Sequence, residues 1–370
     1  MIFKNCTFWG EDFEKEFGDI EIENGKIKQI GILGEGRDMS GMLLVPGFVD
    51  IHIHGFLGGD ASDGDKKAIE TMSRALSHYG VTSFCPTTMT LSREGLEKAV
   101  KAISECEAPK AKIAGINLEG PFISKEKAGS QKSENIRAGS VEEFEKLYSI
   151  SGGKIKLITI APESFESDEF IKTVSKKCTV SIGHSNADEK ACKRAIEFGA
   201  RHITHLYNAM TPMHHRNAGI VGTALDDGRV MCELICDLEH ICPAVLRNTF
   251  RILSQDRAVV VSDSMRGAGL GEGEYDLGGQ KVFVNNGRKY AALSDGTLAA
   301  SITNIHEEFV NLVNIGIDFK TALKACTINP ARAIGEEKSI GSIAIGKCAD
   351  LVFLNENLDI KEVYINGILA

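Results

Sequence analysis

The chain has 370 residues, of which 43% are hydrophobic and 25% are charged. Its formal net charge of −9 argues against binding to nucleic acid, because such proteins need a predominantly basic surface to displace counterions from phosphates. The first residues lack the continuous apolar core of a secretory signal, and no window approaches the ~18 apolar residues of a membrane span. We therefore expect a cytoplasmic globular protein with no membrane anchor.

Both ends of the chain contain short extended runs separated by turns. Asn-Gly between two such runs is a strong hairpin signal, and it occurs at Asn24-Gly25 and again at Asn366-Gly367. The extended runs cover residues 1–8, 17–23, 26–32, 349–354 and 360–365. We predict that residues 1–45 and 336–370 together form one small β-sandwich domain.

Between these ends, short apolar runs alternate with longer amphipathic segments. This alternation is typical of parallel βαβ units, and about eight such runs predict a closed (β/α)8 TIM-like barrel of the α/β class over residues 46–335. The apolar runs are 48–54, 82–86, 113–119, 155–161, 179–184, 202–205, 230–236 and 258–263, and the amphipathic segments include 66–79, 94–106, 188–198 and 301–314.

Side chains that could bind a metal or carry a proton stand at the ends of five apolar runs. Barrels of this kind place their active sites at the C-terminal ends of the strands, so these side chains should converge. They are His52 and His54 after the first run, then Glu119, His184, His205 and Asp263 after four later ones.

The pair His52 and His54 is informative because residues two apart on a strand point the same way and can hold one ion. The alternative interpretation is that they are two half-buried polar residues on a barrel rim. It is less favoured because three more residues that could bind a metal occur at equivalent positions. Histidine and carboxylate ligands favour Zn²⁺, with Fe²⁺, Mn²⁺ or Co²⁺ as substitutes. Asp263 follows an apolar strand and could exchange protons with a metal-activated water, although a turn or capping Asp is the competing interpretation.

The other histidines and the cysteines have plainer interpretations. The ten cysteines include no CxxC pair, so we expect reduced thiols, and the group Cys232, Cys236 and Cys242 is better explained by packing than by zinc. We interpret His78, His202 and His306 as structural. For His214 and His215, which precede Arg216 in an expected loop, structural and phosphate-binding roles are equally open.

Several motifs together resemble a known family. The segment from Pro46 to Gly55 looks like the opening signature of the amidohydrolase superfamily. Four further motifs resemble those of the N-acetylglucosamine-6-phosphate deacetylases: Leu118-Glu119-Gly120-Pro121-Phe122, Gly183-His184-Ser185, the segment from Thr204 to Met210, and Asn329-Pro330-Ala331. The resemblance runs from about Leu44 to the final strands.

The resemblance implies roles for the residues at the strand ends. Glu119, His184 and His205 would hold the main catalytic metal, and His52 and His54 match the pair that can hold a second ion. Asp263 matches the catalytic acid and base of the family. One or two divalent ions per subunit are implied, together with a homodimer that completes the phosphate site across its interface.

The resemblance also implies a set of substrate contacts. Where the family commonly has a histidine after the Glu-Gly-Pro motif, this chain has Gln131, which can form hydrogen bonds but cannot become cationic. Arg216 is a physically sensible phosphate partner, because its planar fork makes two charge-assisted hydrogen bonds. The implied contacts are Ser130, Gln131, Asn208, Ala209, Arg216, His240, Leu298, Ala299 and Ala300.

The expected activity is hydrolytic deacetylation of a small sugar phosphate, N-acetyl-D-glucosamine 6-phosphate, to glucosamine 6-phosphate and acetate. Alternatives are N-acetylgalactosamine 6-phosphate as substrate, another amidohydrolase reaction such as opening of a cyclic amide or deamination of a base, and a non-catalytic scaffold. The presence of all five expected ligands and of Asp263 counts against the scaffold.

Overall fold

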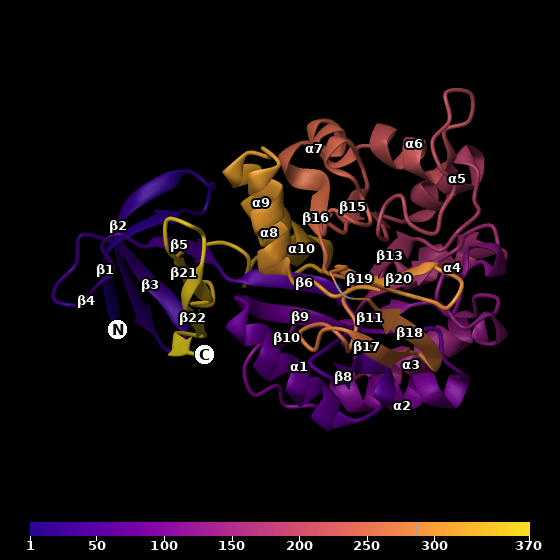
Figure 1. The fold of residues 1–370 in the computed structure, drawn as a ribbon, viewed down its shortest axis with the longest axis horizontal. Coiled ribbons are helices and arrows are strands. Elements are labelled where there is room, and N and C mark those ends of the chain that lie inside the picture. Colours follow the sequence, from indigo (N-terminus) through magenta and orange to yellow (C-terminus); the bar gives the residue numbers. More distant parts are fainter. Residues whose placement is uncertain (286) are drawn as a thin grey trace.

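A computed structural model describes residues 1–285 and 287–370 and places the two ends of the chain in one small sheet. In Figure 1 the indigo N-terminal strands and the yellow C-terminal strands lie together on the left, beside the larger barrel. The strand order is β23-β22-β21-β5-β1-β2-β3, with β4 paired to β1. The strands are β1 (Ile2–Trp9), β2 (Lys15–Glu23), β3 (Lys26–Gly31), β4 (Arg37–Asp38), β5 (Leu43–Pro46), β21 (Leu351–Leu354), β22 (Ile360–Ile365) and β23 (Ile368–Leu369).

The small sheet wraps around its own apolar core, in which Phe3 packs edge to face against Phe353 and Tyr364. The two expected Asn-Gly turns are present, and both residues of each turn have positive φ. The turns also lie against each other, because a Cβ on Gly25 would come within 3.3 Å of the Asn366 Cβ.

Eight parallel strands form the predicted barrel, in the order β6-β9-β11-β12-β13-β14-β15-β16, and β10 (Lys112–Ile113) pairs with β9. Every residue of β9 is buried, as expected for a strand covered on both faces. Hydrogen bonds from Asp263 N to His52 O and from His54 N to Ser264 O join the chain after β16 to β6. The strands are β6 (Phe48–Ile53), β9 (Val81–Thr88), β11 (Ile116–Glu119), β12 (Ile155–Ile160), β13 (Thr179–Ile182), β14 (His202–Ile203), β15 (Met231–Leu234) and β16 (Ala258–Val260).

Helices surround the barrel strands, and polar side chains mark where several of them begin. Asp65, Ser92, Asp188 and Asn304 each accept a hydrogen bond from a backbone N–H in the first turn of the helix that follows. The helices are α1 (Lys66–His78), α2 (Arg93–Ser104), α3 (Val141–Ile150), α4 (Ser167–Val174), α5 (Glu189–Phe198), α6 (Gly219–Asp226), α7 (Pro243–Arg257), α8 (Ile305–Asn314), α9 (Phe319–Cys326) and α10 (Ile328–Ala333). Among the described residues, no helix combines the length and apolar character that a bilayer span requires.

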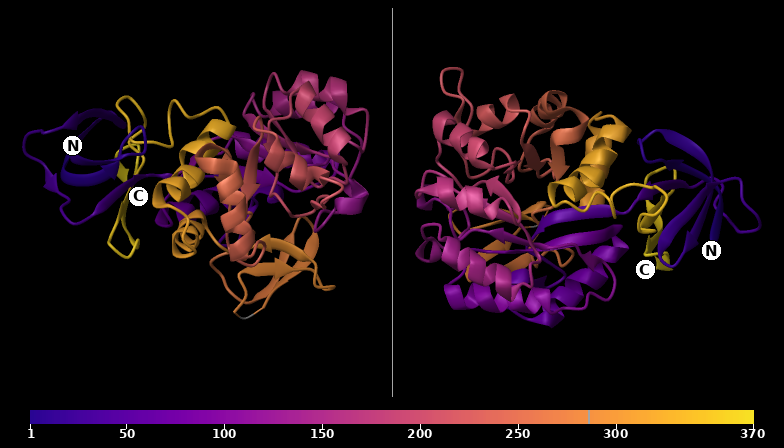
Figure 2. Two further views of the ribbon diagram at one scale, coloured as in Figure 1. Left: turned by 90° about the horizontal axis from the view of Figure 1, so that it is seen from above. Right: turned by 180° about the vertical axis from the view of Figure 1, so that it is seen from behind.

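A four-stranded antiparallel sheet is inserted between β16 and α8, where we predicted no strands from the sequence. Its orange strands lie at one side of the barrel in the left view of Figure 2. The last strand includes Ser301, so the helix predicted to begin at residue 301 begins instead after its Asn304 cap. The strands are β17 (Gly273–Leu277), β18 (Gln280–Val284), β19 (Tyr290–Ala292) and β20 (Leu298–Ser301).

Candidate metal centre

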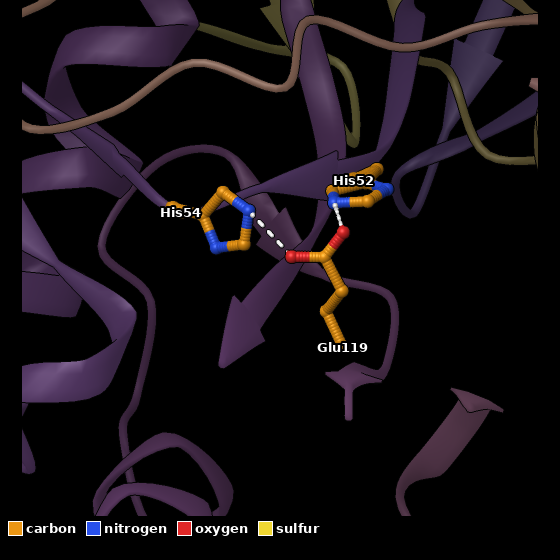
Figure 3. Close-up of side chains that lie close together, drawn as sticks. All are labelled: His52, His54 and Glu119. Atoms are coloured by element: carbon orange, nitrogen blue, oxygen red, sulfur yellow. Dashed lines mark ion pairs between the residues drawn. The ribbon is translucent and has the colours of Figure 1, made fainter. Parts of the chain in front are cut away.

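Glu119, the last residue of β11, is the centre of a buried cluster of histidines. Its Oε1 lies 3.0 Å from His184 Nε2 and 2.9 Å from His205 Nε2. Oε1 also lies 3.3 Å from His52 Nε2, and Oε2 lies 3.2 Å from His54 Nε2 (Figure 3). All five residues are at least 95% buried. The structure therefore brings together the five residues predicted as metal ligands.

The donor atoms of this cluster fit a divalent ion. The Nε2 atoms of His184 and His205 lie 3.1 Å apart and face the same carboxylate oxygen. Two protonated ring nitrogens could not approach this closely, so at least one of them presents a lone pair that a cation could accept. His52 Nε2 is buried and has no hydrogen-bond partner among the described residues. Two groups that share Glu119 could each hold an ion: His52 and His54 with Glu119, and Glu119 with His184 and His205.

Backbone carbonyls fix the orientation of two of these imidazoles. His54 Nδ1 lies 3.1 Å from Thr87 O, and His184 Nδ1 lies 2.8 Å from Lys127 O. Because a carbonyl oxygen can only accept, each Nδ1 carries a proton, and in the neutral imidazole each Nε2 then presents a lone pair. This is the tautomer that metal coordination through Nε2 requires.

Glu233 on β15 contacts one residue of each ligand group. Its Oε2 lies 2.9 Å from His52 Nδ1 and accepts a hydrogen bond of 3.0 Å from His205 N. The side chain is fully buried. Glu233 was not predicted as a site residue, although a glutamate inside the apolar run 230–236 is itself a signal, because charged side chains are rarely buried without a partner.

Asp263 lies on the other side of His52 and His54. Its Oδ1 is 3.2 Å from His54 Nε2 and 3.5 Å from His52 Nε2, and the residue is 7% exposed. Burial alone would raise the pKa of Asp263, but the two histidines hold it below its usual range. The carboxylate is therefore ionised at neutral pH and can accept a proton.

Three of these residues leave their strands with a left-handed backbone. The φ angles are 45° at His184, 26° at His205 and 46° at Asp263. Such conformations are uncommon for residues other than glycine and persist where neighbouring contacts fix them. Before His184, Gly183 allows close packing, because a Cβ there would come within 2.5 Å of the Thr204 Cβ.

A cavity of about 300 Å³ opens onto this cluster. Six of the predicted substrate contacts line it, and they come from loops after several strands and from β20. The His240 imidazole in its wall donates a 2.6 Å hydrogen bond from Nδ1 to Asp237 Oδ2. Burial alone would lower the pKa of His240, but the Asp237 carboxylate outweighs it and raises the pKa. The six contacts are Ser130, Asn208, Ala209, His240, Leu298 and Ala299.

The other three predicted substrate contacts do not line the cavity. Gln131 donates from its Nε2 to Glu119 and accepts a 2.7 Å hydrogen bond from Thr90 N, so it supports a predicted ligand. Arg216 lies in an exposed loop, where its guanidinium contacts His215. Ala300 is part of β20 and is fully buried in the apolar core of the inserted sheet. Their contact with substrate stays a prediction.

Lys127 is the one lysine or arginine among the described residues that line the cavity, and the sequence analysis did not select it. No ion pair involves it in the described part of the chain. A lysine in the loop after a ligand-bearing strand was the available signal, because such loops form the active site of a barrel.

The remaining histidines and cysteines lie outside the cavity. His202 is fully buried beside Ser181, His306 lies 2.7 Å from Leu358 O, and His78 is exposed at the end of α1. His214 and His215 are exposed, and their rings contact each other at an interplanar angle of 40°. Among the described residues, no candidate metal group includes a cysteine. Cys232 and Cys236 are buried, whereas Cys242 is exposed.

Comparison with known proteins identifies the family. The model of the amidohydrolase family matches residues 43–369. N-acetylglucosamine-6-phosphate deacetylase of Bacillus subtilis (strain 168) is 37% identical, over 100% of this chain and 97% of that protein. N-acetylgalactosamine-6-phosphate deacetylase of Escherichia coli O157:H7 is 30% identical, over 98% of this chain and 96% of that protein.

The solved structures agree with the sequence comparison. The crystal structure of N-acetylglucosamine-6-phosphate deacetylase from Pasteurella multocida superposes with a TM-score of 0.93 at 30% identity, over 100% of this chain and 99% of that one. The chain therefore belongs to the amidohydrolase family, among the N-acetylglucosamine-6-phosphate deacetylases.

Proposed function

We propose that the protein hydrolyses the acetamide of N-acetyl-D-glucosamine 6-phosphate to glucosamine 6-phosphate and acetate. The observation that carries this proposal is the histidine cluster around Glu119, with the ionised Asp263 beside it at the base of a cavity. A metal-binding group next to a proton acceptor suits the hydrolysis of an amide.

The residues of the site can be given separate tasks. A divalent ion held by Glu119, His184 and His205 would polarise the acetamide carbonyl and lower the pKa of a water molecule from ~15.7 towards ~7. Asp263 accepts a proton from this water as the water oxygen bonds to the acetamide carbon. Asp263 then donates the proton to the amine nitrogen as the carbon–nitrogen bond breaks. His240, whose Nδ1 is occupied by Asp237, is left with Nε2 to hold the substrate.

The phosphate needs cationic and hydrogen-bonding partners, and Lys127 and Asn208 in the cavity wall supply one of each. Arg216 would add a bidentate partner if the exposed loop that carries it reaches the cavity of a second subunit. We therefore propose a homodimer, in agreement with the assembly that the family resemblance implies.

The ion itself and the cellular location belong to the same proposal. The nitrogen and oxygen donors favour Zn²⁺, with Fe²⁺, Mn²⁺ or Co²⁺ as substitutes, and the second group at His52 and His54 allows one or two ions per subunit. An enzyme of sugar-phosphate metabolism acts where its phosphorylated substrate is made, so we propose a cytoplasmic location.

The experiment that tests the proposal is a substrate panel with the metal-loaded protein. The panel compares the gluco and galacto forms of N-acetylhexosamine, each with and without the 6-phosphate, and measures release of free amine. We expect the phosphorylated gluco form to have the highest kcat/KM. A higher value for the galacto form would reassign the hexosamine, and no hydrolysis of either phosphorylated form would overturn the deacetylase function.

A further inference from the structure

Glu233 occupies a position that neither the cavity nor the metal itself explains. It is fully buried on β15, it does not line the cavity, and it belongs to neither group of candidate ligands. A buried carboxylate is costly unless it is paired, so its contacts should explain why it is tolerated. Those contacts lead to both ligand groups at once.

One oxygen of Glu233 makes both contacts. Oε2 lies 2.9 Å from His52 Nδ1 and accepts a 3.0 Å hydrogen bond from the backbone N–H of His205. His52 belongs to the first ligand group and His205 to the second. His205 also has the smallest positive φ of the ligands, 26°, so its hydrogen bond to Glu233 helps fix a strained backbone.

The three oriented imidazoles differ in the charge of their acceptors. Neutral backbone carbonyls hold His54 and His184, whereas a carboxylate holds His52. A carboxylate that accepts a hydrogen bond from Nδ1 of an imidazole fixes the tautomer of the ring and makes Nε2 a stronger donor to a metal. The other Glu233 oxygen has no hydrogen-bond partner among the described residues and lies 3.7 Å from His202 Nδ1. Among the described residues, the hydrogen bonds of the Glu233 carboxylate are therefore made with His52 and His205.

We propose that Glu233 is a positioning residue that couples the two ligand groups, holding the His52 ring and the His205 backbone through one shared, charged oxygen. The inference rests on the metal centre of the proposed function, but it concerns ion binding and not the identity of the substrate. The positioning role of Glu233 can therefore be wrong while the deacetylase function is correct. Equally, the deacetylase function can be wrong while Glu233 has this role.

The test is metal affinity in Glu233→Gln, measured by competition with a chromogenic chelator for Zn²⁺ and by the visible absorption spectrum of the Co²⁺ form. Glutamine has nearly the same shape and can still accept both hydrogen bonds, so the substitution removes mainly the charge. We expect ~10–100-fold weaker binding, the usual effect of losing a partner behind a ligand, together with a changed Co²⁺ spectrum. An affinity within about twofold of the wild-type protein, in the folded variant, would overturn the proposal.

Glu308→Gln is the matched control. Glu308 also has a fully buried carboxyl group, whose pKa burial raises well above its usual range, but it accepts hydrogen bonds from Cys236 N and Thr303 Oγ1 and touches no candidate ligand. We expect its metal affinity to equal that of the wild-type protein, and an equal loss in both variants would overturn a specific role for Glu233. If Glu233→Gln does not fold, Glu233→Asp replaces it, because the shorter side chain cannot reach both donors. A folded Asp variant with wild-type affinity would likewise contradict the proposal.

Discussion

Asp263 Oδ1 lies 3.2 Å from His54 Nε2, so the proposed proton carrier is held by an imidazole of the histidine pair that ends β6. The carboxylate that moves protons and the imidazole that could bind a second ion are thus direct neighbours. Any change at either residue should be followed both in turnover and in metal content.

Asp263→Asn should nearly abolish turnover and leave the main ion in place. The amide cannot accept the water proton, and loss of a general base commonly costs ~10²–10⁴-fold in rate. Initial rates of amine release, with metal content from elemental analysis, check this prediction. Full turnover in the variant would show that another group moves the proton.

Removal of metal should abolish activity and lower thermal stability. Without a cation, Glu119 and four imidazoles remain buried around empty coordination positions, whereas a ligand that binds only the folded state stabilises it by mass action. Dialysis against a chelator, followed by calorimetry and by addition of Zn²⁺, Mn²⁺ or Co²⁺, gives the measurement. Unchanged turnover in protein that analysis shows to be metal-free would contradict the proposed chemistry.

Lys127→Ala should weaken binding of the phosphorylated substrate selectively. A hydrogen bond to a charged group contributes ~1.5–3 kcal/mol, so we expect KM to rise ~10-fold or more for the 6-phosphate. The KM for N-acetylglucosamine without phosphate should change little. Lys125→Ala is the control, because Lys125 is exposed in the same loop and does not line the cavity. Equal changes in KM for both substrates would contradict the proposal that Lys127 binds the phosphate.

Arg216 should act on the active site of the neighbouring subunit. Arg216→Ala and Asp263→Asn homodimers are each expected to be impaired, but a mixed dimer contains one cavity with Asp263 and an intact Arg216 from its partner. Unfolding the two variants together and refolding them should therefore restore activity, up to about a quarter of the wild-type specific activity for random pairing of subunits. Sedimentation velocity tests in parallel whether the protein is a dimer. Absence of any recovery would place Arg216 within its own subunit's site or outside both.

Asp227 gives a prediction for stability at acid pH. A hydrogen bond from the Arg229 guanidinium holds the pKa of Asp227 at about 2, below the ordinary value of 3.8. A lowered folded-state pKa contributes stability that is present above the unfolded pKa and is lost as pH falls from about 4 towards 2. Asp227→Asn should therefore be less stable than the wild-type protein at neutral pH, and the difference should shrink across this window. Urea denaturation at several pH values measures it, and a constant difference would refute the linkage.

The sequence predicted the barrel and the converging ligands because both depend on a local pattern, the residue type that ends each apolar run. It could not predict which neighbours face each other across the barrel. Glu233 reaches His52 from a strand 181 positions away, and Gln131 supports Glu119 instead of lining the cavity. The inserted sheet of β17 to β20 was missed because glycine-rich hairpins carry little hydrophobic periodicity.

The contact between the turns at Gly25 and Asn366 also bears on the order of events during synthesis. The first strands leave the ribosome more than three hundred residues before the last ones that complete their sheet. Until then the edge of β5 that will bind β21 is unpaired, and the apolar face around Phe3 lacks Phe353 and Tyr364. The nascent N-terminal segment therefore exposes an unpaired strand edge and an apolar face to other chains for almost the whole of translation. The barrel can begin to fold during the same period.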